Sequence, residues 1–183
     1  MAFITGRREI SKDIDKEYWQ SVKKIVGDYT GLPEEHKSTI IFARHLYQML
    51  LLGSIKQKGE KVVIDGMIPV LKRLKNRFKL ALITTAPEDI VLPTLRMARM
   101  LKLFDHILTQ PLQTKPSKAK LIEKFQRKYG RLLFYIGNTR EDMLACRRNR
   151  INGILAKWDE YDEVDSDYHV KRPQELLRII TSF

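Results

Sequence analysis

Polar side chains follow two apolar segments of this chain. Thr84 and Thr85 come directly after LALI at residues 80–83, and Asn138 and Asp142 follow LLFYIG at residues 132–137. Threonine can donate hydrogen bonds to phosphate oxygens, while carboxylate and amide oxygens are the ligands that hard cations such as Mg²⁺ prefer. Lys115, in a KPSK loop between the two segments, adds a positive charge. The pattern predicts a phosphate or metal site.

The elements around these residues alternate between strands and helices. Apolar runs predict strands at 80–84, 104–109, 132–137 and 153–158, and helical spacing predicts helices at 66–76, from residue 87 onward, at 118–129 and at 141–149. A short edge strand and a terminal helix follow. This order favours a Rossmann-like α/β fold, a parallel sheet with helices on both faces. Ligands of such sheets bind at the carboxyl ends of the strands, where Thr84, Thr85, Asn138 and Asp142 fall.

The first 60 residues have a different pattern. AFIT at residues 2–5 predicts a very short strand, and apolar spacing predicts two helices, over about 13–28 and from Pro33 towards Gly53. We expect residues 1–10 and 61–183 to form the α/β core and residues 11–60 to form a small helical cap inserted into it.

Composition limits the class of protein and its partners. The 183 residues suggest one domain, no apolar run approaches a membrane span, and the N-terminus does not resemble a secretory signal, so we expect a cytoplasmic protein without a membrane partner. The single Cys146 excludes an internal disulfide. A net charge of +12 favours phosphorylated ligands or nucleic acid. The oligomeric state is left open.

Three segments in order, ALITT, KPSK and GNTRED, resemble the second, third and fourth motifs of the haloacid dehalogenase (HAD) superfamily, a group dominated by phosphate-monoester hydrolases. The resemblance covers roughly residues 62–183. It implies a HAD-like core, phosphatase chemistry on a phosphorylated small molecule, and Mg²⁺ as cofactor. By the same resemblance, the phosphate-binding residues are Thr84, Thr85 and Lys115, with Lys118 as a competing lysine. Asp142 with Asn138 holds the metal. A purely structural role for Asp142, in the first turn of a helix, stays open.

The chain departs from the motifs of the superfamily at three places. Asn138 stands where an acid is usual, and Asn149-Arg150-Ile151 replaces an alanine-glycine-isoleucine sequence. No apolar strand of the sequence ends in the aspartate-x-aspartate pair of the first motif; Asp13-Ile14-Asp15 has these letters, but its charged neighbours predict the start of a helix. Residues 2–5 are the best positional match for its strand, which puts Thr5 at the position of the nucleophile and Arg7 at that of the acid/base.

Neither replacement suits catalysis. Threonine is a poor nucleophile without an adjacent base, and arginine does not release a proton near neutral pH, although it can grip a phosphate. Two hypotheses follow: a phosphatase of weak or lost activity, or a degenerate module that binds a phosphorylated ligand, nucleic acid or a protein. An upstream segment that carries the aspartate pair is a third explanation.

Overall fold

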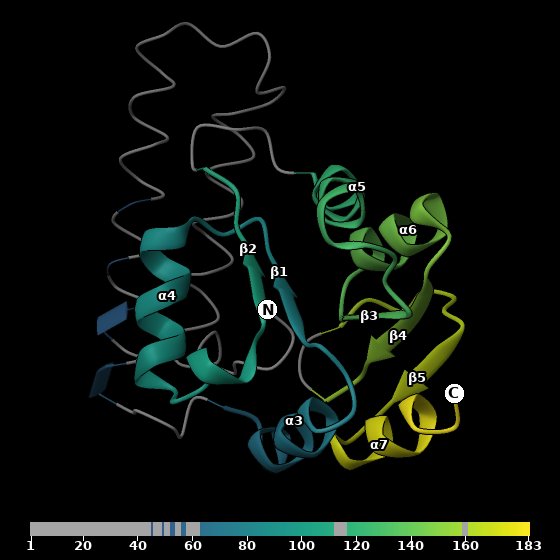
Figure 1. The fold of residues 1–183 in the computed structure, drawn as a ribbon, viewed down its shortest axis with the longest axis horizontal. Coiled ribbons are helices and arrows are strands. Elements are labelled where there is room, and N and C mark those ends of the chain that lie inside the picture. Colours follow the sequence, from purple (N-terminus) through teal and green to yellow (C-terminus); the bar gives the residue numbers. More distant parts are fainter. Residues whose placement is uncertain are drawn as a thin grey trace, which may run out of the picture.

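The computed structural model describes residues 63–111, 117–158 and 161–183, together with a few single positions between 45 and 57. The predicted strand at 2–5, the predicted cap at 11–60 and Lys115 lie outside the described residues and stay predictions. The described elements follow one another in the order α3 (Met67–Lys75), β1 (Ala81–Ile83), α4 (Glu88–Met97), a 3-10 turn (Leu101–Leu103), β2 (His106–Leu108), α5 (Lys118–Tyr129), β3 (Phe134–Gly137), α6 (Arg140–Asn149), β4 (Asn152–Ala156), β5 (Tyr168–Val170) and α7 (Gln174–Ile180) (Figure 1).

Every pairing between the described strands is parallel. β1 pairs with β2, with Ala81 opposite His106, and β4 lies between β3 and β5, with Ile136 opposite Ile154. The predicted α/β fold with parallel strands is therefore confirmed. The described strands nevertheless form two sheets, β1–β2 and β3–β4–β5, and the facing edges belong to β1 and β3.

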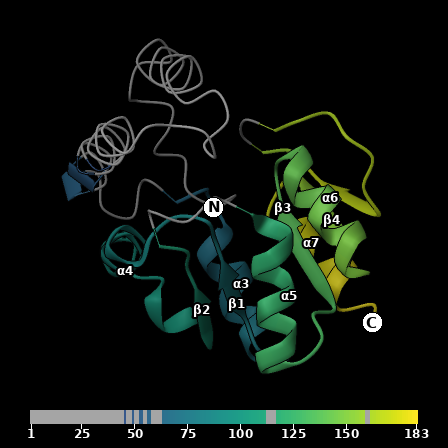
Figure 2. The same cartoon turned by 90° about the horizontal axis from the view of Figure 1, so that it is seen from above.

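Helices cover both faces of the strands (Figures 1 and 2). On one face, α3 and α7 pack Leu74 and Leu176 against Ile154 of β4. On the other face, α5 and α6 pack Ile122 and Ala145 against Ile83 of β1. Burying an apolar stripe of each helix against the strands is what makes these short elements stable.

Local sequence signals set the ends of the two helices nearest to the polar residues. α5 begins after Ser117, whose hydroxyl accepts the Lys120 N–H at 3.5 Å. α6 begins after Thr139 in a reciprocal capping box, in which the Thr139 hydroxyl accepts the Asp142 N–H at 3.1 Å and the Asp142 carboxylate accepts the Thr139 N–H. Both helices begin at the carboxyl-end edge of the strands.

No helix within the described ranges is long and apolar enough to span a membrane.

Candidate phosphate site at the carboxyl ends of the strands

Lys118 and Asp142 form a buried ion pair at the carboxyl-end edge. The Lys118 Nζ lies 3.2 Å from Asp142 Oδ1, and the two side chains are only 10% and 6% exposed. Lys118 is the first residue of α5 and Asp142 lies in the first turn of α6, so the pair ties the starts of two helices together. A second bond joins the same two helix starts, since the backbone N–H of Lys118 donates to Glu141 Oε1 at 3.1 Å.

The Asp142 carboxylate is surrounded by donors. Its Oδ2 accepts the Thr139 hydroxyl at 2.8 Å and the N–H groups of Asn138 and Thr139 at 3.2 and 3.3 Å. Its Oδ1 faces Lys118 and lies 3.5 Å from the Tyr135 hydroxyl. Burial raises the pKa of Asp142, but the Lys118 ammonium and the Thr139 hydroxyl outweigh burial, so the pKa falls below its ordinary value. Asp142 is thus an ionised acceptor at neutral pH.

Gly137 makes room for this carboxylate. A Cβ atom on Gly137 would collide with the carboxyl group of Asp142, which lies directly over the end of β3. The glycine that ends the apolar segment is therefore required by close packing, since its backbone geometry is ordinary for a strand.

Thr84 follows β1 and is 4% exposed. Its N–H donates to the Leu108 carbonyl at 3.0 Å, and its hydroxyl oxygen accepts the Ala86 N–H at 3.1 Å. The backbone N–H that could have met a phosphate is thus used by β2, while the hydroxyl hydrogen can still be donated. Thr85 beside it is half-buried.

The structure brings Thr84, Asn138 and Asp142 to one edge, as the alternating pattern predicted. It also places Lys118, the competing lysine, against Asp142. Tyr135 was not among the predicted site residues. Its hydroxyl donates to the Ile83 carbonyl at 3.2 Å, its ring lies 5.8 Å from the Lys118 Nζ, and burial followed by the charge of Asp142 raises its pKa. The sequence signal for Tyr135 is its hydroxyl group, which stands within the otherwise apolar run at residues 132–137.

The described residues do not by themselves fit Mg²⁺. No group of three or more acidic, histidine or cysteine side chains gathers within residues 63–111, 117–158 and 161–183. Asp142 is already engaged by the donors named above, and its counter-charge is the Lys118 ammonium. A hard cation prefers six or more oxygen ligands, of which this edge offers few.

The residues that replace the alanine-glycine-isoleucine sequence have structural roles. Arg150 ends α6 in the left-handed conformation, with φ of 54°, which glycine adopts without strain. Asn149 joins the two helices, since its Nδ2 donates to the carbonyls of Ala119 and Ala145 at 3.1 and 2.9 Å. Both residues thus serve the end of α6 and its contact with α5.

A search of curated protein sequences finds no match. Among solved structures, the fold is similar to a predicted phosphatase from Clostridium acetobutylicum, with 23% identity and a TM-score of 0.69 over 90% of this chain and 76% of that one. It is similar to a HAD phosphatase from Thermococcus onnurineus, with 16% identity and a TM-score of 0.65 over 97% and 93% of the two chains. The HAD hydrolase YfnB from Bacillus subtilis, solved with magnesium bound, matches at 17% identity with a TM-score of 0.62 over 93% of this chain and 83% of that one.

These likenesses show the fold. The family model described as haloacid dehalogenase-like hydrolase matches residues 11–156, which is most of the sequence. Together with the order of the motifs, this match shows that the chain belongs to the haloacid dehalogenase-like hydrolase family.

Proposed function

We propose that this protein binds a phosphate monoester at the carboxyl-end edge of its strands and hydrolyses it slowly or not at all. The observation that supports this most is the buried pair of Lys118 and Asp142, at 3.2 Å, at the edge where Thr84 follows β1. It combines a fixed ammonium with a carboxylate that stays ionised. The ligand class comes from the family and from the phosphatases of the same fold.

The binding half of the proposal follows from charge and donors. Phosphoryl-group enzymes work mainly by positioning the phosphate and stabilising its charge. Lys118 and the Thr84 hydroxyl would provide an ammonium and a donor from the described residues. Lys115, which resembles the lysine of the third motif, would provide a second cation. Asp142 would act as a positioning residue, since its lowered pKa keeps it from releasing or taking a proton near neutral pH.

We expect slow turnover because the acidic side chains at this edge are already engaged in hydrogen bonds. Both oxygens of Asp142 are engaged by donors, and Glu141 accepts the Lys118 N–H. A carboxylate held in this way is a poor nucleophile. The residues proposed for the first motif, Thr5 and Arg7, have no carboxylate either.

Turnover of p-nitrophenyl phosphate, measured with and without Mg²⁺, tests the slow-turnover half. We expect rates no higher than those of a preparation that carries Asp142→Asn. Rapid Mg²⁺-dependent turnover that Asp142→Asn abolishes would support an active phosphatase instead, which is the function that the family model suggests.

Thermal unfolding with and without millimolar inorganic phosphate tests binding. We expect phosphate to raise the melting temperature, since a ligand that binds only the folded state stabilises it. Thr84→Val and Lys115→Gln should reduce this shift. Lys120→Gln, an exposed position of α5, is the matched control and should leave it unchanged. An equal shift in all variants would place the anion elsewhere.

A second candidate rests on the net charge of +12, which suits nucleic acid. It predicts that the protein binds nucleic acid with an association constant that falls steeply as the salt concentration rises, on logarithmic scales. Binding without that dependence would argue against it.

A further inference from the structure

The outer sides of α5 and α6 carry a dense group of positive charges. The two helices lie side by side on one face of the strands (Figure 2), and the Asn149 side chain of α6 donates to the Ala119 carbonyl of α5 at 3.1 Å. The exposed cations of the two helices are Lys120, Lys124, Arg127, Lys128, Arg140, Arg147 and Arg148. Two exposed acids, Glu123 and Glu141, belong to the same helices. We call this surface the basic face.

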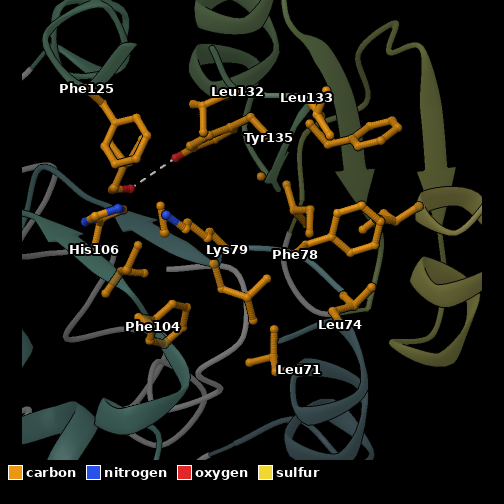
Figure 3. Close-up of a pocket in the computed structure, with 18 of the residues that line it drawn as sticks. Leu71, Leu74, Phe78, Lys79, Phe104, His106, Phe125, Leu132, Leu133 and Tyr135 are labelled. Atoms are coloured by element: carbon orange, nitrogen blue, oxygen red, sulfur yellow. Dashed lines mark hydrogen bonds between the residues drawn. The ribbon is translucent and has the colours of Figure 1, made fainter. Parts of the chain in front are cut away.

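The cations of each helix form a stripe. On α5 they recur every three or four residues, which places them on one side of the helix. Phe125, on the other side of α5, points towards the pocket between the strands (Figure 3). On α6, Arg140 shares one side with Arg147 and Arg148, two turns further on. Since packed helices have axes about 8–10 Å apart, the basic face presents two neighbouring rows of positive charge.

Helix stability does not account for the whole of these stripes. The helix dipole favours cations in the last turn of a helix and disfavours them in the first. Lys120 nevertheless lies in the first turn of α5, which has no acid, and α6 begins with Arg140. Among the described residues, the basic-face cations with an acid within 4.0 Å are Arg127, bound to Glu123, and Arg147, near the exposed Asp165. The stripes therefore offer most of their charge to an external anion.

The opposite face of the strands is less densely charged. Helices α3 and α7 together expose three cations, Lys72, Arg73 and Arg178. Lys75, at the end of α3, is paired with Asp105 at 3.1 Å. The positive charge of the described helices is thus concentrated on α5 and α6.

We propose that the basic face binds the phosphate backbone of a nucleic-acid duplex, without regard to base sequence. Lysine and arginine side chains that neutralise phosphates release the counterions of the nucleic acid, and this release supplies sequence-independent affinity. Two rows of cations suit a duplex, which carries phosphates on two strands. The proposal rests on the second candidate function, nucleic-acid binding, to which it gives a location, and it does not involve the phosphate site.

The side chains of the basic face favour a duplex over other anionic partners. Single strands are held by aromatic rings that stack on bases, and membrane surfaces by an exposed apolar side. The large exposed apolar side chains of α5 and α6 are Leu144 and Tyr129, and the Tyr129 ring is already stacked on His106 at 4.1 Å. A second copy of the chain is disfavoured, because each copy carries a net charge of +12.

Fluorescence anisotropy of a short labelled DNA duplex, titrated with the full chain between about 50 and 200 mM salt, tests the proposal. The variant Lys120→Gln/Lys124→Gln/Arg140→Gln/Arg148→Gln should lose at least about tenfold in affinity, and its salt slope should fall by about 0.9 for each lost contact. The charge-conserving variant Lys120→Arg/Lys124→Arg/Arg140→Lys/Arg148→Lys should bind as wild type does, which separates loss of charge from damage to the fold.

The matched control removes the same numbers of lysines and arginines from the opposite face, in Lys72→Gln/Arg73→Gln/Lys171→Gln/Arg178→Gln. These four positions are exposed. The control should lose less than about threefold in affinity, because salt screens charges that lie far from the duplex.

Four results would overturn the proposal. They are equal losses in the glutamine variants of the two faces, a loss confined to the control, tighter binding of a single strand than of the duplex, and a wild type that binds no duplex. Of these, only the last would also remove the second candidate function. The phosphate site is tested separately, since the shift in melting temperature with inorganic phosphate should persist in the basic-face variants whether or not they bind the duplex.

Discussion

Replacing Lys118 by methionine tests the central contact of the site. The variant keeps the length and apolar stem of the side chain but leaves Asp142 as a buried charge without its ammonium. Removing one partner of a buried pair typically costs about 3–5 kcal/mol. The Thr139 hydroxyl and two backbone N–H groups still bond to Asp142. We therefore expect a loss of unfolding free energy at the lower end of this range, about 3 kcal/mol at pH 7.

The loss should depend on pH in a defined direction. The pKa of Asp142 is lowered in the folded protein, so its contribution to stability is present above the unfolded pKa, near 3.9, and fades as the pH falls through the folded value. In the variant the ammonium is gone and burial dominates, which raises the pKa of Asp142. The difference between wild type and variant should therefore be largest at neutral pH and shrink towards pH 3.

Urea unfolding followed by circular dichroism at pH 7 and pH 4 measures both effects. Lys120→Met, at an exposed position of the same helix turn, is the control and should stay within about 0.5 kcal/mol of wild type. The double variant Lys118→Met/Asp142→Asn should lose less than the sum of the two single changes. If Lys118→Met matched Lys120→Met at pH 7, or if its loss grew on acidification, the reasoning about this pair would be refuted.

Three other predictions concern packing, backbone conformation and thiol reactivity. Gly137→Ala should cost at least about 2 kcal/mol in urea unfolding, because the new Cβ meets the carboxyl group of Asp142; a neutral change would contradict the close packing. Arg150→Gly should raise the free energy of unfolding by about 0.5–1 kcal/mol, because it relieves a left-handed φ of 54°, whereas Arg148→Gly inside the same helix should lower it by about 1 kcal/mol. Changes of the same sign in the two variants would contradict this. Cys146, whose pKa is raised to about 12 by burial and then by the charges of Asp142 and Asp167, should not react with Ellman's reagent at pH 8 until the protein is unfolded; rapid labelling of the native protein would show an accessible thiol.

The helices and strands could be predicted because their signals are local. Helix α5 begins at Lys118 and ends at Tyr129, which are the bounds that its helical spacing predicted. The strands are each a little shorter or shifted relative to the apolar runs, because backbone pairing, not composition, sets their ends: β1 covers residues 81–83 of the predicted 80–84.

The contacts within the site could be predicted only in part. Parallel strands bring Thr84 and Asp142 to one edge, which a pattern of alternating elements implies. The pairing of Lys118 with Asp142 depends on how α5 packs against α6, a tertiary relation that no local pattern contains. Asp142 had two open roles, metal ligand or acid of the first helix turn, and its bonds to Thr139 show the second, without testing the first. The division of the described strands into two sheets was not predicted, since strand pairing depends on long-range contacts.

The bonds between α5 and α6 have a consequence for local opening of the molecule. Lys118 holds Glu141 and Asp142, while Asn149 holds Ala119, so the first turn of α5 is fastened to both the beginning and the end of α6. Segments fastened in this way open as one cooperative unit. A movement of the first turn of α5 would therefore break bonds to both ends of α6, so the stabilities of the two helices are coupled.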